Sequence, residues 1–119
     1  MRILIALACG LALLLPVSAP AGTHTLTGSV GKNGAFKITL TLNGKRVTHL
    51  PAGTYTIIVH DYSKVHNFAL GSITKNKRIF TGSVPGVGTK TYRVKLTRGS
   101  YAYACSAHPS IMNGQFSVT

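Results

Sequence analysis

The chain has 119 residues, with thirteen lysines and arginines against one acidic residue, Asp61, and its formal net charge is +12. This length leaves room for one domain and a targeting segment, and the single carboxylate excludes paired-carboxylate glycoside hydrolysis, all-oxygen Ca²⁺ or Mg²⁺ sites and two-metal phosphoryl transfer. The charge indicates an anionic partner, but only 12% of the residues are charged, which excludes a polybasic disordered tail.

The first segment has the pattern of a secretory signal peptide. Arg2 provides a positive start, and the apolar run that follows is too short to span a bilayer as a helix. Small residues come next, and they permit cleavage after Ala19 or Ala21. We favour Ala21, because the other site would leave a proline at the new N-terminus. We therefore expect a signal peptide over 1–21, a mature domain over 22–119 and a periplasmic or secreted location.

Removal of this segment would leave one cysteine, Cys105, and one methionine, Met112, and the loss of Arg2 would lower the formal charge to +11. A lone thiol is unusual in a secreted protein, because thiols in oxidising compartments normally pair. Cys105 is therefore expected to have a role other than disulfide formation.

From Thr23 onwards the sequence is typical of an all-β domain. Alternating apolar and polar residues predict strands over 36–42, 92–96, 101–105 and 115–119, and β-branched residues predict a central strand over 55–59. Weaker strands are expected at 47–49 and 67–70. Turns are expected at 43–44, 51–53, 84–88 and 98–99, and a polar connection over 71–78. In the first strand Phe36 should face inward together with Ile38. No 3.6-residue period is present, so we predict a Greek-key β-sandwich or barrel of seven to eight strands.

The only soft metal ligands of the mature chain lie in one segment, Cys105-Ser106-Ala107-His108-Pro109-Ser110-Ile111-Met112. A loop between two strands that carries a thiolate, an imidazole and a thioether can direct all three to one point. A second imidazole would have to come from elsewhere, and His66, in His66-Asn67-Phe68, is the candidate. Two imidazoles and a thiolate with a weak axial thioether form a blue-copper electron-transfer site.

These two segments resemble the copper-binding elements of the cupredoxins, the family of plastocyanin, azurin, pseudoazurin and amicyanin. The resemblance extends through Gly99-Ser100-Tyr101 before the cysteine strand and through the ending Met112-Asn113-Gly114-Gln115-Phe116. It implies four ligands for one type 1 copper ion per chain: His66, Cys105, His108 and Met112.

The resemblance also implies a hydrogen bond between Asn67 and Ser106 that joins the two ligand loops, the kind of support that metal sites need. Tyr101 stands where this family and other Greek-key sandwiches often carry a corner tyrosine. The loop differs from each subfamily: the gap of two residues from Cys105 to His108 is like that of plastocyanin and amicyanin, whereas the gap of three to Met112 matches that of azurin.

Other kinds of site fit the residues less well. Structural zinc sites use cysteine, histidine and carboxylate, and a thioether is a poor zinc ligand. A cysteine–histidine nucleophile needs a third, orienting group, and the only carboxylate, Asp61, is expected to be a turn residue. His49 and His60 lack the Asn-Phe context and are expected at the surface.

The start of the mature chain offers a further candidate for a metal site. If cleavage follows Ala21, the free amine, the amides and the imidazole of Gly22-Thr23-His24 could form a square-planar Cu(II) or Ni(II) site. An ordinary strand histidine at His24 is the favoured alternative.

The resemblance implies a one-electron carrier, not an enzyme, that works outside the cytoplasm. The ring edge of His108 would be the electron exit, with Pro109 and Ile111 as an apolar contact patch for an anionic redox partner. We expect a monomer with no transmembrane segment in the mature chain. No stripe of alternating basic and aromatic residues is present, so no nucleic-acid binding is expected. A copper store or chaperone, and a basic sandwich that binds anionic polymers, remain open alternatives.

Overall fold

The computed structural model describes residues 24–119, so the predicted signal peptide and its cleavage sites lie outside the described residues, as do Gly22 and Thr23. One group of strands is β1 (His24–Val30), β2 (Ile38–Leu42), β3 (Lys45–Arg46), β5 (Gly53–Asp61) and β8 (Gly88–Leu96). The other is β4 (His49–Leu50), β6 (Ala69–Ser72), β7 (Lys77–Thr81), β9 (Gly99–Ala104) and β10 (Asn113–Val118). A short 3₁₀ helix, η1 (Lys32–Gly34), follows β1.

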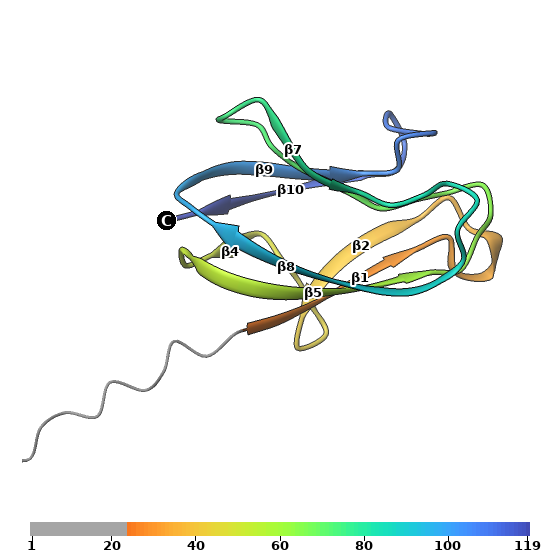
Figure 1. Ribbon diagram of the computed structural model, residues 1–119, viewed down its shortest axis with the longest axis horizontal. Helices are drawn as coiled ribbons and strands as arrows, with labels where there is room; N and C mark the ends of the chain where they lie inside the picture. Colours follow the sequence, from red (N-terminus) through yellow and green to blue (C-terminus); the bar gives the residue numbers. More distant parts are fainter. Residues whose placement is uncertain (1–23) are drawn as a thin grey trace, which may run out of the picture.

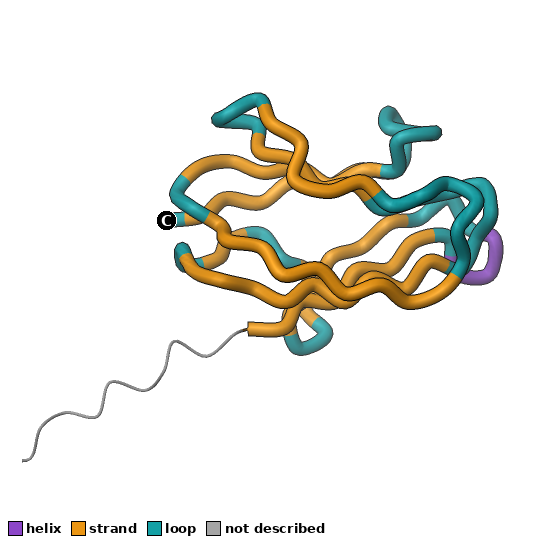
Figure 2. Tube along the Cα trace, in the orientation of Figure 1, coloured by secondary structure: helices purple, strands orange, loops and turns teal. Residues whose placement is uncertain are grey.

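The strands form two five-stranded sheets, in the orders β3-β2-β1-β5-β8 and β4-β10-β9-β6-β7. Figure 1 shows them as two layers, and Figure 2 shows most of the loops gathered at the two ends of the sandwich. Both sheets are mixed, because β1 pairs in parallel with β5, and β10 with β4. The predicted all-β sandwich is confirmed. Ten strands replace the seven to eight expected, partly because β3 and β4 have only two residues each.

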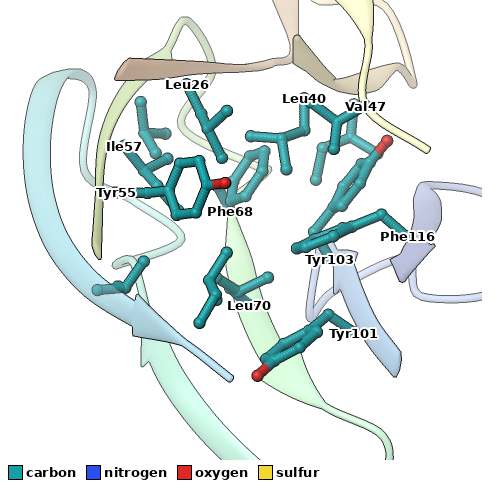
Figure 3. Close-up of a cluster of buried hydrophobic side chains, with 14 of the residues drawn as sticks. Leu26, Leu40, Val47, Tyr55, Ile57, Phe68, Leu70, Tyr101, Tyr103 and Phe116 are labelled. Carbon is teal, nitrogen blue, oxygen red and sulfur yellow. The ribbon is translucent and has the colours of Figure 1, made fainter. Parts of the chain in front are cut away.

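The core lies between the sheets, where the alternating apolar residues of both layers meet (Figure 3). Aromatic rings form much of it: Phe68 stacks on Tyr103 with ring centroids 5.5 Å apart, and Tyr101 stacks on Phe116 at 5.3 Å. The hydroxyl of Tyr101 donates to the carbonyl of Thr97 at 2.6 Å, the bond of a corner tyrosine. This rigid core fixes the ends of β6, β9 and β10, from which the ligand candidates project.

The weak strand expected at 47–49 is not formed, because Val47 and Thr48 lie between β3 and β4. Two further local predictions are wrong. Phe36 does not face inward: β2 begins at Ile38, and the Phe36 side chain is 57% exposed. The cause is the preceding turn, in which Gly31, Asn33 and Gly34 all have left-handed backbone angles that alternation does not reveal.

The other error is the polar connection expected over 71–78. The structure has β6 to Ser72 and β7 from Lys77, so only 73–76 form the turn. Strand β7 is at the edge of its sheet, paired only with β6, and its first two residues are exposed lysine and arginine. An edge strand of this kind carries charged residues, whereas a central strand with one buried face would show alternating apolar and polar residues. Between 24 and 119, no helix is long and apolar enough to cross a membrane.

Candidate metal centre

The loop between β9 and β10 carries three of the four ligand candidates and is closed by its own backbone. Cys105 directly follows β9 and Met112 directly precedes β10, and the amide of Cys105 donates to the carbonyl of Met112 at 3.0 Å. Within the loop, the carbonyl of His108 accepts from the amide of Met112 at 3.0 Å, and the amide of His108 donates to the carbonyl of Cys105 at 3.2 Å. In Figure 1 this loop is the blue segment at the right.

His66 comes from a different part of the chain, the segment between β5 and β6. Strand β6 pairs with β9, with Ala69 opposite Ala104, so the residues before β6 lie beside those that follow β9. The amide of Asn67 donates to the sulfur of Cys105 at 3.4 Å. Sheet register therefore brings together two segments that are separated by 39 positions in the sequence.

Three ligand atoms converge at this place. The Nδ1 atoms of His66 and His108 are 3.1 Å apart, and the sulfur of Cys105 lies 3.9 Å from the first and 3.7 Å from the second. A point in the plane of these three atoms lies about 2.1 Å from each, and nitrogen and sulfur ligands bind zinc at about 2.0–2.3 Å. The residues therefore fit a metal ion bound by three ligands in a plane.

The site is buried on the inside and partly open on the outside. His66 and Cys105 are fully buried, and His108 is partly exposed. Phe36, whose position the sequence did not predict, stands over both imidazoles, with ring centroids 4.8 Å from His66 and 5.0 Å from His108 in edge-on contacts. Its ring covers part of both imidazoles.

Asn67 joins the two ligand loops. Its amide nitrogen donates to the hydroxyl of Ser106 and to the carbonyl of Gly82, both at 2.8 Å, and its side-chain oxygen accepts from the amide of Ser106 at 2.7 Å. The Asn67 side chain is itself fully buried. The hydrogen-bond pair that the resemblance implied is present, with a third bond, to Gly82, that the sequence did not indicate.

The second ring nitrogen of His66, Nε2, has a different environment from Nδ1. This atom is buried and has no hydrogen-bond partner among residues 24–119. A neutral imidazole carries its proton on one nitrogen, so a metal ion on Nδ1 would keep the proton on Nε2. Because Nε2 has no hydrogen-bond partner, packing holds the orientation of the His66 ring. Gly31 lies so close to this ring that a Cβ added at Gly31 would be 3.1 Å from it.

Met112 is fully buried in the core cluster, at the base of the same loop. Its backbone contacts to Cys105 and His108 fix the point from which the thioether leaves the chain. Pro109 and Ile111 are exposed beside His108, and Ile111 is 64% exposed.

The remaining polar candidates lie outside this cluster. His49 bonds to Ser117 and Thr119, and His60 bonds to Thr89, all at exposed positions. The carboxylate of Asp61 accepts from the amide of Ser63 at 3.0 Å, which is the turn role expected of it. Burial raises the pKa of Asp61 above its usual value, although the hydrogen bond from Ser63 and the charge of Lys90 act in the opposite direction.

A two-sheet sandwich with two histidines and a buried cysteine gathered at one end defines a cupredoxin-like architecture. Solved structures with this fold match the chain. The copper protein rusticyanin matches with a TM-score of 0.64 at 15% identity, over 84% of this chain and 80% of its own. Auracyanin A, a "blue" copper protein from Chloroflexus aurantiacus, matches with a TM-score of 0.56 at 22% identity, over 82% of this chain and 100% of its own.

A mutant of amicyanin in its Cu(I) form matches with a TM-score of 0.52 at 16% identity, over 81% of this chain and 83% of its own. No protein-family model matches the sequence, and no curated protein matches it. The resemblance to the cupredoxins is thus confirmed at the level of the fold, and the His66-Cys105-His108 group lies in a chain with that fold.

Proposed function

We propose that this chain is a type 1 copper protein that carries single electrons outside the cytoplasm. The observation that supports this most directly is the triangle formed by His66 Nδ1, His108 Nδ1 and Cys105 Sγ, with sides of 3.1, 3.7 and 3.9 Å. Met112 at the base of the same loop would be a fourth ligand. Solved copper proteins with the same fold add to this support.

The chemistry of the donor set favours copper over the main alternatives. Sulfur ligands favour Cu(I), and imidazole binds both oxidation states, so this set suits a metal that cycles between them. Bound copper would supply a one-electron redox couple. Full burial of Cys105 argues against a nucleophile that attacks a substrate, because such a thiolate must be accessible.

The chain's own residues would keep the ligand geometry constant. The backbone bonds within the 105–112 loop hold Cys105 and His108, and Asn67 ties the His66 segment to that loop. Phe36 covers part of both imidazoles. A site that moves little when its charge changes loses little energy to rearrangement, which favours rapid electron transfer.

We propose His108 as the point of electron exit, because it is the one nitrogen ligand candidate with partial exposure. Pro109 and Ile111 beside it would form the apolar contact for a partner. The strongly basic chain would attract an anionic redox protein and raise its association rate more than its affinity. The rate of electron transfer to such a partner should fall steeply with ionic strength, and a rate independent of salt would refute this steering.

Absorption spectroscopy of the copper-loaded mature protein tests the ligand set. We expect an intense band from thiolate-to-copper charge transfer that Cys105→Ala abolishes. His108→Ala should alter or abolish it, whereas His49→Ala, outside the cluster, should leave it unchanged. Met112→Leu should retain copper and raise the reduction potential. A band that persists in Cys105→Ala would refute the proposed site.

Reversible voltammetry and electron self-exchange separate a carrier from a copper store or chaperone. A carrier should cycle many times without copper loss, whereas a store should release Cu(I) to a competing chelator on reduction. The intact mass of the secreted protein tests the location and the start of the mature chain, which we expect at Gly22.

A further inference from the structure

A basic cleft lies at the opposite end of the sandwich from the His66-Cys105-His108 group. It has a volume of about 370 Å³ and lies between β7 and β8, which are the edge strands of the two sheets. Four cations line it, Lys75, Lys77, Arg78 and Lys95. The β6–β7 turn and the β8–β9 turn, whose residues Lys75 and Thr97 line the cleft, lie at the left in Figure 1.

The cations of this cleft have no acidic side chain beside them. Asp61 is the only acidic residue of the whole sequence. It pairs with Gly88 at one end of the β5–β8 ladder, whereas Leu96, beside the cleft, pairs with Gly53 at the other end. Eight residues of strand separate those ends, which is about 26 Å. No acidic side chain therefore relieves the mutual repulsion of these four cations, and an anion of several charges would relieve it.

The walls of the cleft are held in place by hydrogen bonds. The ammonium group of Lys75 donates to the hydroxyl of Thr97 at 3.1 Å, which links the two walls. The turn that carries Lys75 is attached to the start of β9, because the amide of Ser100 donates to the hydroxyl of Thr74 at 2.8 Å and the amide of Ile73 donates to the carbonyl of Ser100 at 2.8 Å. A ligand would thus meet a site that is already formed, which lowers the entropic cost of binding.

We propose that this cleft binds the phosphate groups of a multivalent anion. The planar guanidinium of Arg78 matches two phosphate oxygens at once, and lysine ammonium groups bind the remaining oxygens as point charges. The cleft provides one arginine and three lysines, and the hydroxyl groups of Ser72 and Thr97 lie in its lining as further polar groups. The phosphate can belong to a free oligophosphate or to an anionic lipid headgroup, and binding to pyrophosphate or to lipid vesicles distinguishes the two sources.

This site is separate from the proposed electron exit. Tyr101, which lines the cleft, precedes Cys105 by four residues along β9, about 13 Å of strand. An occupant of the cleft would leave His108 and its apolar neighbours free for a redox partner. The inference does not rest on the proposed function, because it uses no residue of the His66-Cys105-His108 group.

Titration of the purified mature protein with pyrophosphate, at constant ionic strength set by chloride, measures the binding. We expect saturable binding that Lys77→Gln/Arg78→Gln weakens by about tenfold or more. The matched control is Lys45→Gln/Arg46→Gln, which removes the same two charges from the exposed strand β3 and should change the affinity less than about twofold.

A second pair of variants tests the other wall. Lys95→Gln should weaken binding, and Lys90→Gln, on the same strand but away from the cleft, should not. Urea unfolding of each variant shows whether it retains its fold; these lysines are exposed, so the unfolding midpoints should be nearly equal.

Vesicles of phosphatidylglycerol in phosphatidylcholine provide the lipid arm of the same experiment. Binding of pyrophosphate with the expected dependence on cleft residues identifies a free phosphate compound. Cleft-dependent binding to the vesicles alone identifies a lipid headgroup. Equal weakening by the cleft and control variants would overturn the proposal, because the attraction would then come from the overall charge of the protein. Binding to neither pyrophosphate nor vesicles would also overturn it.

Discussion

Replacement of Asn67 with alanine should loosen the connection between the two ligand loops. The side chain makes three hydrogen bonds, two with Ser106 and one with Gly82. Each hydrogen bond contributes about 0.5–1.5 kcal/mol net, and the partners of Asn67 are partly reachable by water after its removal. We therefore expect Asn67→Ala to lower the free energy of unfolding of the metal-free protein by about 2–4 kcal/mol.

Urea unfolding of metal-free protein measures this change, with two controls of graded severity. Ser106→Ala removes only the bond between the Asn67 amide and the serine hydroxyl, and should cost about 1 kcal/mol. Asn113→Ala removes one exposed bond, to the carbonyl of Pro109 at 2.8 Å, and should cost less than about 1 kcal/mol. An Asn67→Ala variant no less stable than Asn113→Ala would refute the idea that Asn67 is what joins the loops.

Three further changes test other features. Phe36→Ala should change stability little, because its ring is 57% exposed, but should speed copper removal by a chelator in a stopped-flow assay, since it uncovers both imidazoles. Gly114→Ala should lower the free energy of unfolding by about 1–3 kcal/mol in urea, because a Cβ there would overlap the ring of Tyr103. Burial raises the pKa of Tyr55 in the folded protein above its usual value of 10.0. The neutral phenol therefore stabilises the folded state below pH 10, and this stability is lost as the pH rises through the raised pKa. Tyr55→Phe loses a 2.6 Å bond to the carbonyl of Pro51, and its stability should decline less steeply in alkali.

Matched controls are available for two of these variants. Val87→Ala removes an apolar side chain that is also 57% exposed but does not lie over the imidazoles, so it should not alter the rate of copper removal. Gly53→Ala places a Cβ at an ordinary 3.9 Å from its nearest neighbour and should be tolerated. If Val87→Ala speeds copper removal as much as Phe36→Ala, shielding by the ring is refuted.

Much of the fold could be predicted because central strands with one buried face carry a period of two. Alternation located β2, β8, β9 and β10, and the β-branched run located β5. Strand β7 was missed because an edge strand with few buried residues has no such pattern. The parallel pairing of β1 with β5 was also beyond prediction, since nothing in either segment specifies its neighbour.

The part of the candidate site that lies within one loop was easier to predict from the sequence than the residues that surround it. Cys105, His108 and Met112 lie within eight positions, so their proximity follows from a single loop. The approach of His66 to Cys105 depends on the pairing of β6 with β9, which no pattern in the sequence specifies. His66 was therefore a candidate from the donor types that the site needs and from the resemblance to a known family. The contact of Phe36 with two imidazoles depends on a turn of left-handed residues, and it had no signal in the pattern of hydrophobicity.

The closure of the 105–112 loop on itself has a consequence for how such a protein can change. Its two ends are fixed by the hairpin of β9 and β10, in which Ala104 pairs with Asn113, and by the bond between the amide of Cys105 and the carbonyl of Met112. Residues inserted or deleted between those ends would alter the distances among the ligand candidates without shifting a single strand register. The length of this loop can therefore change the arrangement of the ligand candidates while the strand pairs that form the core stay the same.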